Sequence, residues 1–228
     1  MIYYKLEYGC DNKEVGSQYP QVWDFIKGYS PENEDNGVYS LYYAYNPLFP
    51  PIDPDLSGFK LAGGAKYTDF LSNGFGNRLF LLSENAKRFM EDQNLDVHRF
   101  YKGKVTSLRK KKVEDYYYVM KLVSENWQYL DFPNCDFFIK HVNTGDIIPT
   151  KFKSPEEFIK KSGELLASEE DCYSIYSSHI KMTDVFHQKN LDLFMIDECN
   201  YDWYVSERFV EEYNKRKLTG LEFEPVDI

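Results

Sequence analysis

The sequence predicts an α+β fold, with a mainly antiparallel, curved sheet and helices packed on one side of it. Short apolar or alternating segments, which are typical of strands, interleave with amphipathic helical segments along the chain. Short hairpin signals and exposed alternation favour this fold over a doubly wound parallel sheet. In addition, Phe80–Phe100 and Trp203–Phe223 match without a gap, with Ser-Glu on Ser-Glu, Leu on Leu and Phe on Phe. The fold is therefore expected to contain two weakly similar strand–helix–strand units.

The first sixty residues predict short elements that precede these units. Residues 2–8 alternate and are rich in Tyr, so we expect a first strand there. Tyr19–Ile26 has one apolar side and predicts a short helix. After the turn signal Asp35–Gly37, the aromatic segment Val38–Tyr45 predicts a second strand. Residues 46–58 contain four prolines and are expected to form an irregular loop.

Each repeated unit is expected to consist of a strand, a serine-capped helix and a second strand. In the first unit the strand is Leu79–Leu82. Ser83 and Ser206 are predicted N-caps, because a serine hydroxyl can accept a hydrogen bond from a free amide of the first helical turn. The buried stripes are expected to be Ala86, Phe89 and Met90 in the first helix, and Phe209, Val210 and Tyr213 in the second.

A basic stretch follows the first unit and raises the question of nucleic-acid binding. Lys102–Lys112 carries several Lys and Arg residues, but it lies between two predicted strands. Glu114 and Asp115 offset its charge directly afterwards. The stretch is therefore interpreted as an exposed hairpin that leads into a strand at Tyr116–Val123.

A second hairpin and a helix are predicted before the second unit. Phe137–Val142 and Ile147–Ile148 flank the turn residues Asn143–Asp146, which indicates a hairpin. Ser154–Glu157 has a cap, a Pro at the first helical position and a Glu at the third, so a helix is expected to begin there. Further strands are expected at Tyr173–Ile180 and in the apolar run Leu191–Ile196.

Length, charge and cysteine usage limit the class of protein. The 228 residues suit one large domain or two small ones, and we expect a single α+β domain over residues 1–228. The net charge of −10 counts against a nucleic-acid partner and suits a soluble protein with a basic partner. The four cysteines lack metal or redox spacing, and the chain has no signal peptide or bilayer-spanning run. A reduced, cytoplasmic location without a membrane partner is expected.

No motif for catalysis, metal binding or cofactor binding is apparent in the sequence. The four histidines lack the close spacing of a zinc site, and no Gly-x-Ser-x-Gly elbow or phosphate-binding glycine loop occurs. Ser83 and Ser206 are explained as caps. We therefore expect no catalytic residues, no metal and no cofactor, although the fold can bring distant partners together.

Clusters of acidic residues near aromatic ones are the candidate partner-binding positions. Carboxylates that are adjacent in sequence do not face each other across a cleft, as glycosidase chemistry requires. The acidic and aromatic mixture around Trp203 would suit a contact surface for a basic partner, and a solvated loop is the alternative. The candidate partner-binding residues are Glu169, Glu170, Asp171, Asp197, Glu198, Tyr201 and Asp202.

Several segments resemble a family of immunity proteins from bacterial polymorphic toxin systems, which was first described as a domain of unknown function. The resemblance covers about residues 61–228 and leaves residues 1–60 without a counterpart. Its motifs are structural ones, in which a cap, a helix and a strand follow one another. The similar segments are Lys66–Leu71, Leu81–Glu84 with its helix, Val113–Tyr118, Trp203–Glu207 and Leu218–Phe223.

The resemblance implies a cytoplasmic antidote that binds the toxin domain encoded beside it and blocks that domain without catalysis. The acidic charge and the aromatic content fit a cognate toxin that is basic. An enzyme or small-ligand-binding protein, with a site assembled from scattered aromatic, acidic and His residues, is the alternative. A scaffold or self-associating protein is a third possibility, on which the sequence is silent.

Overall fold

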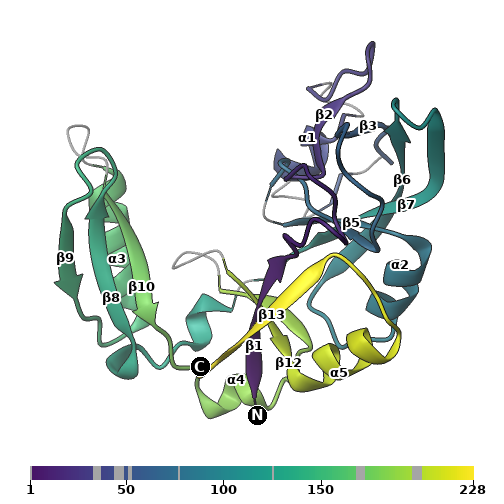
Figure 1. The fold of residues 1–228 in the computed structure, drawn as a ribbon. Coiled ribbons are helices and arrows are strands. Elements are labelled where there is room, and N and C mark those ends of the chain that lie inside the picture. Colours follow the sequence, from purple (N-terminus) through teal and green to yellow (C-terminus); the bar gives the residue numbers. More distant parts are fainter. Residues whose placement is uncertain are drawn as a thin grey trace. The chain divides into compact units, whose positions relative to one another are not determined.

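The computed structural model describes residues 2–32, 37–43, 49–50, 53–76, 78–124, 126–167, 173–196 and 202–228 (Figure 1). The strands and helices confirm the predicted α+β class. The chain divides into two compact units. Unit 1 contains Met1–Lys5, Ser124–Glu207 and Glu224–Ile228, and unit 2 contains Leu6–Val123 and Arg208–Phe223. The expectation of a single domain stays a prediction.

Unit 2 contains a six-stranded sheet. Neighbouring strands in this sheet pair antiparallel, with one exception: β3 and β6 are parallel. This parallel pair requires a crossover, which the intervening hairpin and helix α2 (Glu84–Glu91) provide. The strand order is β2 (Val22–Phe25), β3 (Leu56–Leu61), β6 (His98–Ser107), β7 (Lys112–Leu122), β5 (Leu79–Leu82) and β4 (Phe70–Leu71).

Helix α2 begins and packs as the sequence predicts. The Ser83 hydroxyl accepts a hydrogen bond from the Ala86 N–H at 3.1 Å, which satisfies one free donor of the first turn. Ala86, Phe89 and Met90 are its buried residues. Because these residues recur at helical spacing, one face of α2 is buried while the rest is polar.

Two N-terminal predictions are wrong. Tyr19–Ile26 does not form a helix, because Val22–Phe25 is strand β2, with fully buried Val22 opposite Leu61 of β3. Val38–Tyr45 does not form a strand, because Tyr39–Tyr43 is the short helix α1; residues 44 and 45 lie outside the described residues.

The reason for both errors is tertiary packing, which overrides weak local preference. The edge of β3 offers β2 a partner that the sequence does not display. Val38, directly before α1, and Leu41 within it are both fully buried and are three residues apart, which is a helical spacing. Aromatic content alone therefore favours the wrong element at this segment.

Unit 1 contains a four-stranded sheet with two strands that continue into unit 2. Its strand order is β11 (Leu193–Met195), β12 (Trp203–Ser206), β1 (Tyr3–Tyr8) and β13 (Leu221–Val226). Helix α5 (Glu207–Lys215), which belongs to unit 2 from Arg208 onward, follows β12 directly, and Phe209 and Tyr213 are its buried residues. Val210, predicted to be buried, is partly exposed. Shorter elements of unit 1 are α4 (Asp184–His187) and the 3₁₀ turns Trp127–Tyr129 and Phe132–Asn134.

A second sheet of unit 1 has three antiparallel strands, in the order β10 (Tyr173–His179), β8 (Asp136–His141) and β9 (Ile147–Thr150). The predicted β8–β9 hairpin is thereby confirmed. Helix α3 (Pro155–Leu166) packs on one side of this sheet (Figure 1). The Ser154 hydroxyl accepts from the Glu157 N–H at 3.4 Å, and the Glu157 carboxylate accepts from the Lys153 N–H at 2.8 Å. The helix start is therefore satisfied nearly as a capping box.

Candidate functional site

The serines of the two repeated units make the same two hydrogen bonds to an aspartate, an arrangement that is called a Ser–Asp bracket. The Ser83 hydroxyl donates to Asp69 Oδ1 at 2.6 Å, and the Ser83 N–H donates to the Asp69 carbonyl oxygen at 2.8 Å. The Ser206 hydroxyl donates to Asp192 Oδ1 at 2.6 Å, and the Ser206 N–H donates to the Asp192 carbonyl oxygen at 3.1 Å. In each unit the aspartate lies 14 residues before the serine. Both serines therefore have structural partners.

The two matching segments, Phe80–Phe100 and Trp203–Phe223, do not include these aspartates, because each segment begins in the strand directly before its serine. Asp69 directly precedes β4, and Asp192 directly precedes β11. The repeat therefore includes an additional strand at its beginning, which is short in both copies. The signal that could have revealed it is the equal spacing of Asp and Ser in the two units.

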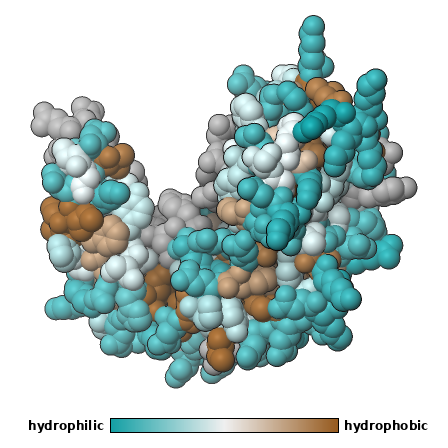
Figure 2. Space-filling model, in the orientation of Figure 1, coloured by the Kyte–Doolittle hydropathy of each residue, from teal (hydrophilic) through white to brown (hydrophobic). Residues whose placement is uncertain are grey.

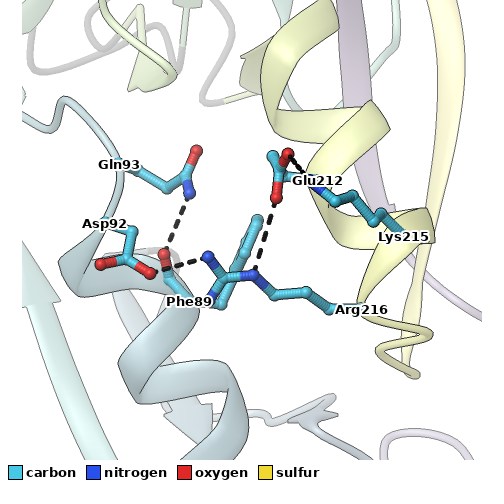
Figure 3. Close-up of polar contacts among 6 residues, drawn as sticks. All are labelled: Phe89, Asp92, Gln93, Glu212, Lys215 and Arg216. Carbon is cyan, nitrogen blue, oxygen red and sulfur yellow. Dashed lines mark hydrogen bonds and ion pairs between the residues drawn. The ribbon is translucent and has the colours of Figure 1, made fainter.

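Helices α2 and α5, one from each strand–helix–strand repeat, contact each other within unit 2. The rings of Phe89 and Phe209 meet edge to face, with centroids 4.7 Å apart. The Arg216 guanidinium forms ion pairs with Asp92 at 2.7 Å and with Glu212 at 3.8 Å (Figure 3). It also lies over the Phe89 ring, 5.5 Å from the centroid. Aromatic packing and a charged bridge together join the two helices.

A hollow of about 360 Å³ lies beside this helix pair and has a partly basic lining. Its arginines already have acidic partners, since Arg88 pairs with Glu84 at 3.1 Å and Arg216 pairs with Asp92. Asp69 adds a negative charge to the lining. The hollow is therefore better explained as part of the helix contact than as an anion site. Its lining residues are Asp69, Asn85, Arg88, Arg216, Lys217 and Leu218.

Of the seven acidic and aromatic candidates, only Asp202 lies within the described residues. Its carboxylate forms an ion pair with Lys5 at 3.2 Å, and both side chains are partly exposed. Such a pair contributes little to stability. Glu169, Glu170, Asp171, Asp197, Glu198 and Tyr201 lie outside the described residues. The acidic partner-binding surface therefore stays a prediction.

The three-stranded sheet of unit 1 presents an aromatic and aliphatic face on the side opposite to its buried residues. Phe137 and Ile139 are buried on the other side, so that Phe138 between them points outward. Phe138 stacks on Tyr176 of β10, with centroids 5.6 Å apart and an interplanar angle of 19°. Strand alternation and register place seven side chains on this outer side, which is called the β8 face: Asp136, Phe138, Lys140, Ile147, Pro149, Ser174 and Tyr176.

Exposed aliphatic residues extend the β8 face to the hairpin. Val142 and Ile147 are 57% and 58% exposed. Ile148 is 52% exposed as well, but it pairs with Ile139 and so lies on the opposite side of the sheet. Figure 2 shows hydrophobic surface over this part of unit 1. Apolar side chains that gather on a surface mark interaction sites more often than single exposed ones do. The hairpin is therefore the best candidate contact surface that the described residues offer.

A hollow of about 440 Å³ opens beside the β8 face. At its rim, Lys151 Nζ donates to Asp136 Oδ1 at 2.5 Å and to the Cys135 carbonyl oxygen at 2.7 Å. The Lys151 ammonium thereby holds the pKa of the Asp136 carboxyl below its ordinary value. Among the residues that the structure describes, the lining contains one acid and no histidine: Asp136, Phe137, Phe138, Ile147, Pro149, Thr150, Lys151 and Ser178. This set can hold an apolar group but lacks a pair of groups for acid–base chemistry.

The described histidines and acids do not assemble into a metal site. Within the described residues, no group of three or more His, Cys, Asp or Glu side chains could hold a metal ion. His141 Nδ1 accepts from the Thr144 N–H at 3.0 Å, and His187 Nδ1 lies 3.3 Å from the Tyr3 hydroxyl. Among the described helices, none combines the length and the hydropathy needed to cross a membrane.

One buried titratable group outside these surfaces is Lys121 of β7, which lies between Leu79 of β5 and Arg99 of β6. Burial and, to a smaller extent, the positive charge of Arg78 lower the pKa of Lys121 to about 8. Below pH 8 Lys121 is protonated in both states, and its positive charge is less favourable in the folded protein than in the unfolded chain. Between pH 8 and the ordinary pKa of 10.5 only the unfolded chain binds this proton, so stability rises with pH.

We expect Lys121→Met to be more stable than the unmodified protein by about 1–3 kcal/mol at pH 7. This difference should shrink as the pH rises from 8 to 10.5, because the penalty on the charged lysine disappears. Urea unfolding of both proteins at several pH values measures it. A difference that is constant from pH 7 to pH 10.5 would contradict the lowered pKa.

Neither a comparison with protein-family models nor a comparison with curated proteins finds a match for the chain. The resemblance to immunity proteins therefore stays an expectation from the sequence. The surfaces described above are the basis for the function proposed next.

Proposed function

We propose that the chain is an immunity protein that binds a cognate bacterial toxin domain and neutralises it by occlusion, without catalysing a reaction. The observation that carries this proposal is the β8 face, with its stacked rings, exposed aliphatic residues and adjoining hollow. Tight protein interfaces use such aromatic and aliphatic anchors, surrounded by polar groups that exclude water. The resemblance over residues 61–228 supplies the class of partner.

The chemistry of the described polar residues supports a binding protein over the alternative of an enzyme. Ser83 and Ser206 are held by Asp69 and Asp192 in structural brackets. The hollow beside the β8 face contains Asp136 as its single acid, and Lys151 neutralises it. An enzyme site would bring a nucleophile, a base and a second polar group together around such a hollow.

The mechanism follows from size and charge. A stable interface buries about 800 Å² on each partner, which is enough to cover the active site of a small toxin domain. The net charge of −10 would accelerate the approach of a basic toxin over distances of about 10 Å in 0.1 M salt. Charge therefore contributes mainly to the association rate, and the apolar contact contributes mainly to the lifetime of the complex.

Co-expression tests this proposal. The chain is expected to restore growth of cells that express the toxin domain encoded by the adjacent gene. Purified chain should bind an inactive variant of that domain, with an association rate that falls about tenfold or more between 50 mM and 500 mM NaCl. Growth that is no better with the chain than without it, for every adjacent toxin candidate, would refute the proposal.

A further inference from the structure

We propose that the β8 face binds an apolar segment of the partner protein that carries a carboxylate, and that this carboxylate pairs with Lys140. The proposal rests on the proposed function, and it specifies the chemistry of the partner at this surface. It concerns the face of the sheet, not its edge. Three observations support it: the apolar content of the face, its one unpaired charge and the proline in the edge strand β9.

The apolar content of the face comes first. The stacked rings of Phe138 and Tyr176 form its centre, and Ile147 and Pro149 flank Phe138 on the β9 side. Because Ile147 is more than half exposed, covering it would remove a large apolar area from water. Aromatic rings also lose little conformational entropy on binding, since they have few rotatable bonds. An aliphatic or aromatic partner segment fits this surface.

The charge of the face is the second observation. Two charged residues, Asp136 and Lys140, lie on the β8 face. The Asp136 carboxylate is paired with Lys151, whereas the Lys140 ammonium forms no ion pair with any residue that the structure describes. A partner that covers the face would remove water from Lys140, and an ammonium that is buried without a counter-charge is strongly unfavourable. A carboxylate on the partner segment offsets this cost.

The requirement for an acid is local and is compatible with a basic toxin. The chain has a net charge of −10, which repels a partner that is acidic overall. A basic toxin with one Asp or Glu in its apolar contact segment satisfies both conditions. Long-range attraction would then depend on the net charge of the whole chain, and the position in which the partner segment binds would depend on Lys140.

One edge of the sheet argues against binding by strand addition. β9 is one of the two edge strands, it has four residues, and one of them is Pro149, whereas the other edge strand, β10, has seven residues and no proline. Proline has no N–H to donate to an added strand, and proline on an edge strand is a common protection against such pairing. On the β9 side, where Ile147 and Pro149 lie, the partner is therefore expected to lie across the β8 face rather than to add a strand next to β9.

The experiment measures binding of the inactive toxin domain from the adjacent gene to full-length variants of the chain, by calorimetry. Ile147→Asp tests the apolar contact. Its control is Val185→Asp on α4, because Val185 is similarly exposed at 60%. Lys140→Glu tests the charge, and its control is Lys160→Glu on α3, which is also exposed. Because all four positions are at the surface, the variants are expected to fold, and circular dichroism verifies it.

We expect the Kd to rise about 100-fold for Ile147→Asp and at least about 10-fold for Lys140→Glu. Both controls should stay within about twofold of the unmodified chain. Lys140→Met should fall between the unmodified chain and Lys140→Glu, because it removes attraction without adding repulsion. A toxin variant in which one acid is replaced by Lys should restore binding to Lys140→Glu.

The possible outcomes separate this inference from the proposed function. If the unmodified chain neither binds nor protects, the proposed function fails and the inference fails with it. If the unmodified chain protects and Ile147→Asp and Lys140→Glu bind as well as their controls, only the inference is wrong. Tighter binding by Lys140→Glu would show a basic segment at this face and would also overturn the inference.

Discussion

Replacement of Phe209 by alanine is expected to lower the free energy of unfolding by about 3–5 kcal/mol. The Phe209 side chain is fully buried in α5. Its ring meets Phe89 edge to face at 4.7 Å and Phe223 at 6.1 Å. Removing it would leave a cavity between the two repeated helices and would also end these aromatic contacts. The surrounding rings cannot fill such a cavity without leaving their preferred rotamers.

Urea unfolding followed by tryptophan fluorescence measures this change. Glu211→Ala on the same helix is the matched control, because Glu211 is exposed and its replacement should change the free energy by less than about 0.5 kcal/mol. A loss below about 1 kcal/mol for Phe209→Ala would contradict the burial of the ring. Under the proposed function, the folded fraction of this variant should bind the toxin domain as tightly as the unmodified chain, since Phe209 is not at the surface.

Elements with strong local signals could be predicted from the sequence. Ser83 before α2 and Ser154 before α3 have the hydroxyl, the following acid and the apolar spacing that start a helix. The β8–β9 hairpin has a turn sequence between two apolar strands, with Gly145 at a positive φ of 80°. In these cases the residues that decide the structure lie within a few positions of one another.

Elements that depend on distant partners could not be predicted. β2 is a strand because Val22 pairs with Leu61, almost forty residues later. β3 pairs in parallel with β6 across an intervening hairpin and helix, and no local signal specifies that choice. Sequence periodicity describes which residues are apolar, whereas the available strand edge decides how a short segment pairs.

The candidate site shows the same limit. The hairpin that contains Ile147 was predicted, but its apolar residues resemble those of any half-buried strand. Their exposure follows from the position of β9 at the edge of a three-stranded sheet, with α3 on one side only. The role of Asp69 was likewise invisible, because its partner Thr219 is 150 positions away.

Replacement of Asp69 by alanine is the second change with a large expected effect, a loss of about 3 kcal/mol. Asp69 accepts hydrogen bonds from the Ser83 hydroxyl at 2.6 Å, the Thr219 N–H at 3.1 Å and the Thr219 hydroxyl at 3.0 Å. These bonds link the start of the first repeated helix to the turn before β13. Alanine would leave partly buried donors without an acceptor, which costs more than the loss of an exposed bond.

Thermal and urea unfolding of Asp69→Ala measure this loss, with Asp11→Ala as the control. Asp11 also accepts a hydrogen bond, from the Lys13 N–H at 2.8 Å, but at an exposed turn, so its loss should stay below about 1 kcal/mol. If Asp69→Ala added to Ser83→Ala costs little more than either change alone, the two residues act as one bracket. Full additivity would mean that the aspartate stabilises Thr219 independently of the serine. Under the proposed function, toxin binding by the folded fraction should be unchanged in either case, since hydrogen bonds that only support the fold contribute nothing selective to the contact with a partner.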